Sequence, residues 1–257
     1  MRQNTIKAKW RGNEPAMVGW MGTADPYMTE IMAHAGFDGL VLDMQHGMGI
    51  GPDRAAQWLQ VVSSTATVPL VRVQWNDPVH IQYVLDAGAM GVIVPLVRNA
   101  EEAGRAGGAA RYAPVGYRSV GPNRARLAHG QDYIQHANEE IICLVMVETE
   151  PTIQHLQAMC AAPGIDGFYV GPSDLAVSMG LGPGADNRDA RHVAAVQAVL
   201  DAANAAGLVA GIHTSGPEES ARRFRQGFRL APIGSDTAFV TAGAKAAIDR
   251  LRSAPAK

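Results

Sequence analysis

An acid, an amide and an imidazole follow an apolar run near the start of the chain, in the sequence GLVLDMQHG of residues 39–47. They are Asp43, Gln45 and His46. An imidazole titrates near neutral pH, so His46 can accept and return protons during a reaction. Asp43 stands three residues before it, where it can fix the tautomer and raise the basicity of the ring. The pair is therefore a candidate for acid–base catalysis.

Two carboxylates further along the chain have the chemistry of a metal site. Glu148 ends the apolar run 142–148, and Asp174 follows the run 167–171. Carboxylate oxygens suit a hard divalent cation such as Mg²⁺ or Mn²⁺, with positions left open for water or substrate. Arg72, at another strand-like run, offers a planar guanidinium group for a carboxylate or enolate oxygen.

These residues need a scaffold that brings them together, and the pattern of apolar runs predicts one. Eight short runs of strand length alternate with helix-like segments: 18–21, 39–43, 69–73, 91–97, 142–148, 167–171, 208–212 and 229–234. Strands that are apolar on both faces indicate a parallel sheet, and eight such units indicate a closed (β/α)8 TIM barrel. We expect a single domain over residues 1–257. An open doubly wound sheet is the weaker alternative, because neither GxGxxG nor GxxxxGK[ST] is present.

A barrel would collect the polar residues that follow its strands. Active sites of such barrels lie at the carboxyl ends of the strands. The residues expected at this mouth are Asp43, His46, Arg72, Glu148, Asp174, His213 and Asp236. Each buried charge needs a partner, so a structural explanation for all seven is difficult.

Composition excludes several classes of function. The formal charge of −2 arises from scattered acids and bases with no basic block, so nucleic acid is not an expected partner. No uninterrupted apolar stretch of about 18 residues is present, so we expect a soluble, cytoplasmic protein with no membrane partner. Cys143 and Cys160 have no metal-site or redox spacing and are interpreted as inert thiols.

The distribution of lysine narrows the reaction. The only lysines are Lys7, Lys9, Lys245 and Lys257. None lies in a predicted strand, which excludes Schiff-base chemistry in the barrel, and no GxSxG motif is present for acyl transfer. A metal-stabilised enolate of a 2-oxo acid remains the favoured chemistry.

The segment 111–132 interrupts the alternation of strands and helices. It is rich in Gly, Pro and Arg and has no convincing periodicity. Ordered loops of this length are usually functional or contact another subunit, and we expect one of these roles here.

Several motifs resemble those of a known family. LDMQHG, VRVQWNDP, VLDAGAMGVIVPLV, RYAPVGYRSVG, VET, GPSDLAVSMG and GSD are similar to successive motifs of the HpcH/HpaI aldolases, a family of class II pyruvate aldolases. The resemblance extends from about residue 19 to residue 236 and implies a TIM barrel of the phosphoenolpyruvate/pyruvate type.

The resemblance also implies a role for individual residues. Glu148 and Asp174 match the ligands of a divalent cation, which would be Mg²⁺, Mn²⁺ or Co²⁺. Arg72 matches the residue that holds the keto acid, and His46 with Asp43 matches the acid–base pair.

Further implied roles concern the substrate and the assembly. The Gly171-Pro172-Ser173 turn matches the segment whose backbone N–H groups receive the substrate carboxylate, and Trp20 is expected to form a wall of the pocket. Asp86 matches an acid that reaches the active site of a neighbouring subunit. The resemblance implies a hexamer in which a C-terminal helix, at about 238–252, is exchanged between subunits.

Three positions depart from the family pattern. Gln45 stands where relatives usually have Glu, and Met146 stands where they usually have Gln. His213 replaces an apolar residue that often lines the aldehyde pocket, so hydroxylated or charged acceptors become candidates, although a hydrogen-bonded structural histidine is an equal alternative.

The sequence thus predicts a metal-dependent aldolase, a carbon–carbon lyase that cleaves 4-hydroxy-2-oxo acids to pyruvate or hydroxypyruvate and an aldehyde. A 2-oxo acid decarboxylase or a CoA-thioester lyase on the same site remains an alternative. A non-catalytic keto-acid-binding protein is another, because Gln45 and Met146 depart from the pattern. The natural aldehyde, the metal and the pathway stay open.

Overall fold

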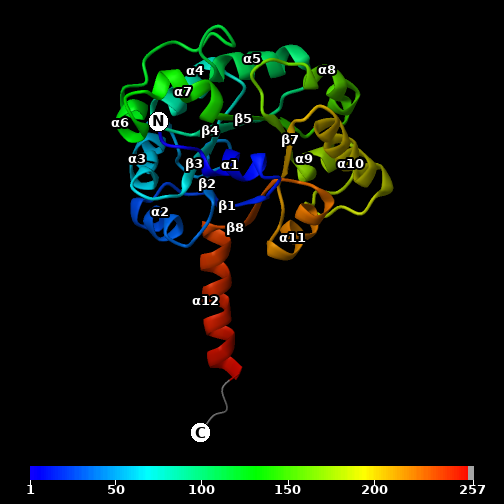
Figure 1. The fold of residues 1–257 in the computed structure, drawn as a ribbon. Helices are drawn as coiled ribbons and strands as arrows, with labels where there is room; N and C mark the ends of the chain where they lie inside the picture. The colour runs from blue at the N-terminus through cyan, green and yellow to red at the C-terminus, as the bar shows by residue number, and fades with distance from the viewer. Residues whose placement is uncertain (254–257) are drawn as a thin grey trace.

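Eight parallel strands form a closed barrel in the computed structural model, which describes residues 1–253 (Figure 1). The strands are β1 (Ala16–Met21), β2 (Gly39–Asp43), β3 (Val68–Arg72), β4 (Gly91–Val94), β5 (Ile142–Val147), β6 (Gly167–Val170), β7 (Val209–Ile212) and β8 (Leu230–Ser235). Each strand pairs in parallel with the next, and β8 pairs with β1 to close the barrel. The predicted (β/α)8 barrel is confirmed.

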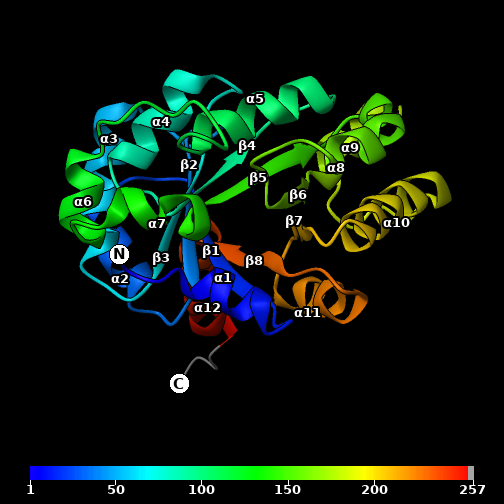
Figure 2. The same cartoon turned by 45° about the horizontal axis from the view of Figure 1, so that its top comes forward.

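The helices surround this barrel (Figure 2). They are α1 (Thr5–Arg11), α2 (Pro26–Ala33), α3 (Pro52–Ser63), α4 (Pro78–Asp86), α5 (Ala100–Ala110), α6 (Asn123–His129), α7 (Tyr133–Glu140), the 3-10 helix η1 (Glu150–His155), α8 (Leu156–Cys160), α9 (Pro172–Ser178), α10 (Ala190–Ala205), α11 (Pro217–Gln226) and α12 (Asp236–Ser253). Among these helices, none is both long and apolar enough to cross a membrane.

Local sequence signals set the ends of several helices. Asp77 caps α4 by accepting a hydrogen bond from the backbone of Val79, and Pro78 occupies the first helical position. Asn99 caps α5 in the same way through the backbone of Glu102. These caps fix where the chain turns after β3 and β4, and therefore which residues face the mouth of the barrel.

The segment 111–132 is ordered, and part of it is helical. It contains α6, and Arg118 is buried, with its guanidinium group bonded to Asp86 and to the hydroxyl of Tyr133. The expectation of a segment without helical structure is wrong for α6, because a helix of seven residues is too short to produce a clear periodicity.

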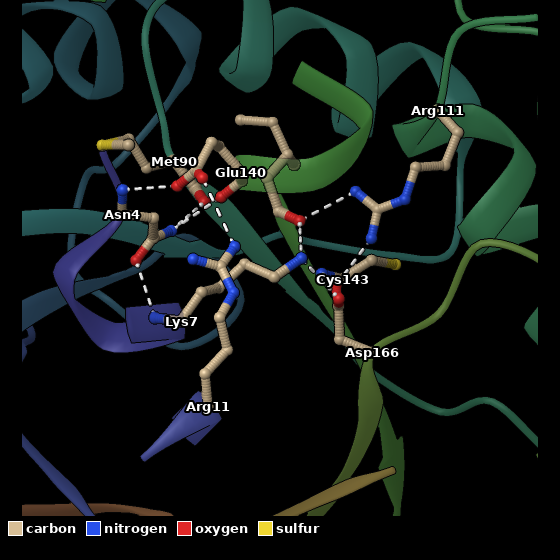
Figure 3. A network of polar contacts seen from close by, with 9 residues as sticks. Asn4, Lys7, Arg11, Met90, Arg111, Glu140, Cys143 and Asp166 are labelled. Carbon is tan, nitrogen blue, oxygen red and sulfur yellow. Dashed lines mark hydrogen bonds and ion pairs between the residues drawn. The ribbon is translucent and has the colours of Figure 1, made fainter. Parts of the chain in front are cut away.

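A polar network lies at the amino ends of β4, β5 and β6, opposite the expected site (Figure 3). The Asp166 carboxylate accepts hydrogen bonds from Lys7 at 2.7 Å, from Arg111 at 2.6 Å and from the backbone of Cys143 at 2.7 Å. Asn4 caps α1 and donates to the carbonyl groups of Met90 and Glu140. The network holds α1 against the amino-terminal end of the barrel.

We expect Asp166→Ala to lower the free energy of unfolding by about 3 kcal/mol, because Lys7 and the buried Arg111 lose their shared counter-charge. Urea denaturation measures the change. The matched control is Asp249→Ala, which removes an exposed ion pair with Lys245 and should change stability little. Equal effects of the two substitutions would contradict the structural role of the network.

Candidate active site

A cavity of about 260 Å³ opens at the carboxyl ends of the strands. It is lined by Trp20, Asp43, His46, Arg72, Met146, Gly171, Pro172, Ser173, Asp174 and His213. Of the residues predicted for the site or its mouth, Asp86, Glu148 and Asp236 are not part of this lining. The barrel therefore gathers residues from β1, β2, β3, β5, the start of α9 and the end of β7 in one place.

Arg72 is held rigidly at the end of β3. Its Nε donates to Asp43 Oδ1 at 2.9 Å and its Nη2 donates to Asp43 Oδ2 at 2.5 Å. The guanidinium carbon lies 5.0 Å from the centre of the Trp20 ring, and Trp20 Nε1 also donates to Asp43 at 3.1 Å. Both charged groups are buried, so this fork-to-fork pair fixes the orientation of the guanidinium group.

The Asp43 carboxylate binds the Arg72 guanidinium group and not the imidazole of His46. Its Oδ1 accepts hydrogen bonds from the backbone amides of Gln45 and His46, both at 3.1 Å. Burial raises the pKa of Asp43, but the Arg72 guanidinium group, the His46 amide and the Trp20 indole N–H together hold this pKa below its usual value. Within residues 1–253 no hydrogen bond joins the Asp43 carboxylate to the His46 ring, which is exposed at the rim. The acid–base role of His46 stays a prediction.

Glu148 lies just beyond β5, beneath the turn between β6 and α9. Its side chain is buried, and Oε1 accepts a hydrogen bond from the backbone of Leu96 at 2.6 Å. The pKa of Glu148 is raised to about 7, mainly by burial and also by the nearby Asp174 carboxylate, while the Leu96 amide and Arg72 act in the opposite direction. Ionised Glu148 is therefore short of positive partners.

Glycine is required where α9 passes over this carboxylate. A Cβ atom on Gly171 would lie 2.7 Å from Glu148 Oε2 and 3.0 Å from Met146 Cε. Any larger residue would have to displace Glu148. The close approach brings the start of α9, with Asp174 in its first turn, over the end of β5.

The two carboxylates fit a hard divalent cation. Glu148 supplies a desolvated carboxylate, and Asp174 supplies an exposed one within electrostatic reach. The described part of the chain contains no group of three or more His, Cys, Asp or Glu side chains arranged for a metal. Mg²⁺ is commonly bound by one or two carboxylates, with water and substrate completing its coordination, so this pair is sufficient.

The turn before α9 offers fewer backbone donors than predicted. The Gly171 N–H already bonds the carbonyl of Val147, and Pro172 has no N–H. Ser173 and Asp174, in the first turn of α9, retain amides that no carbonyl of the helix can accept. These two amides are the ones available to a substrate carboxylate.

Comparison with known proteins decides the family. Residues 16–242 match the HpcH/HpaI aldolase/citrate lyase family. The chain belongs to this family. It is 34% identical to the hydroxypyruvate/pyruvate aldolase of Rhizorhabdus wittichii, over 97% of this chain and 99% of that protein. It is also 34% identical to the 4-hydroxy-2-oxo-heptane-1,7-dioate aldolase of Klebsiella pneumoniae, over 96% of this chain and 94% of that one.

A solved structure gives the same result. An HpcH/HpaI aldolase/citrate lyase family protein from Burkholderia cenocepacia superposes with a TM-score of 0.88 at 31% identity, over 98% of this chain and all of that one (100%). The HpcH/HpaI aldolase family indicated by the motifs is confirmed, and its aldolases are lyases.

The positions that depart from the HpcH/HpaI pattern are distributed unevenly. Met146 and His213 line the cavity, whereas Gln45 does not. Gln45 Oε1 is buried and has no hydrogen-bond partner among the described residues. Of these three side chains, Met146 and His213 are therefore the ones that line the cavity.

Two other acids lie outside this cavity. Asp86, at the end of α4, is paired with Arg118 at 2.7 Å, and its contact with the active site of a neighbouring subunit stays a prediction. Asp236 was expected at the mouth with the other charged residues. This expectation is wrong, because both oxygens of Asp236 accept hydrogen bonds from Gly22 and Thr23 and hold the turn after β1.

Tyr169 is a residue of the site region that the sequence analysis missed. It lies inside the barrel on β6, stacks on Trp20 with ring centroids 6.0 Å apart, and its hydroxyl contacts His213 Nδ1 at 3.2 Å. A tyrosine within an apolar run gave no signal that distinguishes it from a core residue.

Proposed function

We propose that this chain is a divalent-metal-dependent aldolase that reversibly cleaves 4-hydroxy-2-oxo acids to pyruvate or hydroxypyruvate and an aldehyde. The observation that carries the proposal is the Arg72 guanidinium group, fixed by Asp43 and lining the same cavity as Asp174, with Glu148 directly behind Gly171. The activities named for the relatives from Rhizorhabdus wittichii and Klebsiella pneumoniae support the same reaction class.

The chain's own groups account for binding of a 2-oxo acid. The amides of Ser173 and Asp174 donate to its carboxylate, at a helix start that favours negative charge. Arg72 donates to the keto oxygen, where negative charge develops as the carbon–carbon bond breaks. A divalent cation held by Glu148 and Asp174 would supply Lewis-acid polarisation of that keto oxygen.

His46 is the proposed acid–base residue for cleavage. It accepts the proton of the C4 hydroxyl group, the C3–C4 bond breaks to release the aldehyde, and the electron pair passes to the enolate of the keto acid. Protonation of C3 then gives pyruvate or hydroxypyruvate. Synthesis runs the same steps in reverse, so His46 returns the proton to the new hydroxyl group.

A CoA-thioester lyase receives less support from the structure. The basic residues that would bind the nucleotide of CoA are engaged within the fold. Arg111 and Arg118 are buried against Asp166 and Asp86, and Arg124 donates to the carbonyl groups of Ala87 and Leu59. These contacts leave no open arginine cluster in this segment for a phosphate.

Pyruvate exchange tests the proposal directly. In deuterated water with Mg²⁺ or Mn²⁺, we expect the protein to replace the methyl protons of pyruvate by deuterium, and EDTA should abolish the exchange. NMR after removal of the metal measures the lost methyl signal, and the same metal without protein is the control. Absence of exchange with pyruvate, hydroxypyruvate and oxaloacetate would favour the non-catalytic keto-acid-binding alternative.

The assembly is part of the same proposal. Helix α12 extends away from the barrel, and every described residue after Asp236 is exposed (Figure 1). Its exposed apolar side chains are Phe239, Val240, Ile248 and Leu251. These side chains support a hexamer with exchanged C-terminal helices, in which Asp86 reaches a neighbouring site. A cytoplasmic location and the choice among Mg²⁺, Mn²⁺ and Co²⁺ remain predictions.

A further inference from the structure

His213 and Trp20 form a wall shared by two cavities. One is the site cavity of about 260 Å³, and the other, of about 240 Å³, lies at the ends of β7 and β8 and is lined also by Ser215 and Ser235. The His213 ring meets the Trp20 ring edge to face, with centroids 4.7 Å apart. Trp20 is itself fixed by Asp43, so the imidazole has a fixed position in the wall. The reaction described above does not use it.

The buried hydroxyl of Tyr169 determines the tautomer of this imidazole. Tyr169 is fully buried (0% exposed), and its hydroxyl has one hydrogen-bond partner among the described residues, His213 Nδ1 at 3.2 Å. Burial raises the pKa of Tyr169, so the hydroxyl keeps its proton. A buried O–H without an acceptor is costly, and Nδ1 is the acceptor present. The Tyr169 hydroxyl therefore donates to Nδ1, and the proton of a neutral His213 resides on Nε2.

His213 is also neutral at physiological pH. The pKa of His213 is lowered to about 4, mainly by burial and also by the Arg72 charge, while the Asp43 carboxylate opposes both effects. Nε2 has no hydrogen-bond partner among residues 1–253 and is not enclosed by protein atoms. The wall of the cavity thus presents one neutral N–H donor among the apolar surfaces of Trp20 and Met146.

We propose that His213 is a specificity-determining residue whose Nε2–H binds a hydroxyl oxygen of the substrate. This inference rests on the proposed aldolase function. Two substrates carry such a hydroxyl group near the new carbon–carbon bond: a 2-hydroxyaldehyde acceptor and the 3-hydroxy group of hydroxypyruvate.

Paired substrates test the assignment and separate the two sources. The acceptor arm compares kcat/KM for glycolaldehyde and acetaldehyde with pyruvate as the donor. The donor arm compares hydroxypyruvate with pyruvate, with acetaldehyde as the acceptor. We expect His213→Leu to reduce the preference for the hydroxylated partner about tenfold in at least one arm. His213→Gln retains an N–H donor of similar reach and should keep the preference within about threefold of the native value.

Imidazole NMR of the ¹⁵N-labelled protein supplies a readout that is independent of turnover. We expect His213 to be neutral and protonated on Nε2 from pH 5.5 to 8, and Tyr169→Phe to introduce the Nδ1–H form. An Nδ1–H tautomer in the native protein, or unchanged preferences in both arms with His213→Leu, would overturn the assignment. If the native protein exchanges pyruvate protons, such a result leaves the proposed function intact. An absence of both exchange and turnover overturns the proposed function and, with it, this inference.

Discussion

Replacing Arg72 with alanine should lower the turnover number by about two to three decades. In the proposed reaction the guanidinium group supplies the charged donor for the keto oxygen, and one well-placed donor of this kind contributes about 3–4 kcal/mol to transition-state stabilisation. The substitution also leaves the buried Asp43 carboxylate without its fork-shaped partner. Steady-state cleavage of a 4-hydroxy-2-oxo acid at saturating metal measures the loss.

Two companion variants show whether the charge or its position matters. Arg72→Lys keeps the charge but cannot bind both oxygens of Asp43, so it should recover only part of the turnover. Asp43→Asn keeps Arg72 but weakens the pair that orients it, and a loss smaller than that of Arg72→Ala is expected. Near-native turnover of Arg72→Ala would show that the keto oxygen is stabilised elsewhere. Thermal unfolding of each variant identifies losses that are due to folding alone.

The sequence was sufficient to predict the barrel, and with it most of the cavity. The predicted strand 39–43 has the same first and last residues as β2 in the structure. A strand that is buried on both faces is apolar throughout, so its ends are easily distinguished from the polar residues around it. Residues placed directly at strand ends, such as Asp43 and Arg72, were located correctly for the same reason. In a TIM barrel, residues at the carboxyl ends of the strands lie together at the mouth, so a position along a strand predicts a position in the site.

Which side chains pair within the site could not be predicted from the sequence. Asp43 and His46 are close in sequence, yet the Asp43 carboxylate turns to Arg72, because a bidentate guanidinium partner in a buried setting is preferred to a rim imidazole. Asp174 and Asp236 both lie in the chain after a strand, β6 and β8 respectively. The Asp236 carboxylate, however, accepts hydrogen bonds from the backbone amides of Gly22 and Thr23. Such choices depend on distances across the barrel, which no spacing along the chain encodes.

Replacing Glu148 with glutamine should lower metal-dependent turnover by about three decades. The same substitution should stabilise the metal-free protein at pH 8. The loss of turnover follows because one of two carboxylate ligands is removed, and polarisation by the cation contributes several kcal/mol. The gain in stability follows because ionised Glu148 is buried and short of positive partners. Glutamine can still accept the hydrogen bond from Leu96.

The sign of the pH dependence follows from the direction of the shift. The pKa of Glu148 in the folded protein is about 7, above the ordinary value of 4.5, so ionisation opposes folding. This cost is absent below about pH 4.5, grows between the two values and is complete above pH 7. In EDTA at pH 8 we therefore expect Glu148→Gln to raise the free energy of unfolding by about 2–3 kcal/mol, with the advantage lost towards pH 4.5.

Added metal should offset most or all of this stability advantage of the Glu148→Gln variant. A cation at 100 times its dissociation constant stabilises the native protein by about 2.7 kcal/mol, and the Glu148→Gln variant should gain little of this. Asp174→Asn is the matched control, because this carboxylate is exposed: it should lose the response to metal without gaining stability in EDTA. If both variants gained stability equally in EDTA, the burial of Glu148 would not be the cause. If Glu148→Gln kept the native response to Mn²⁺, the cation would bind elsewhere, and the buried carboxylate would have to be explained without it.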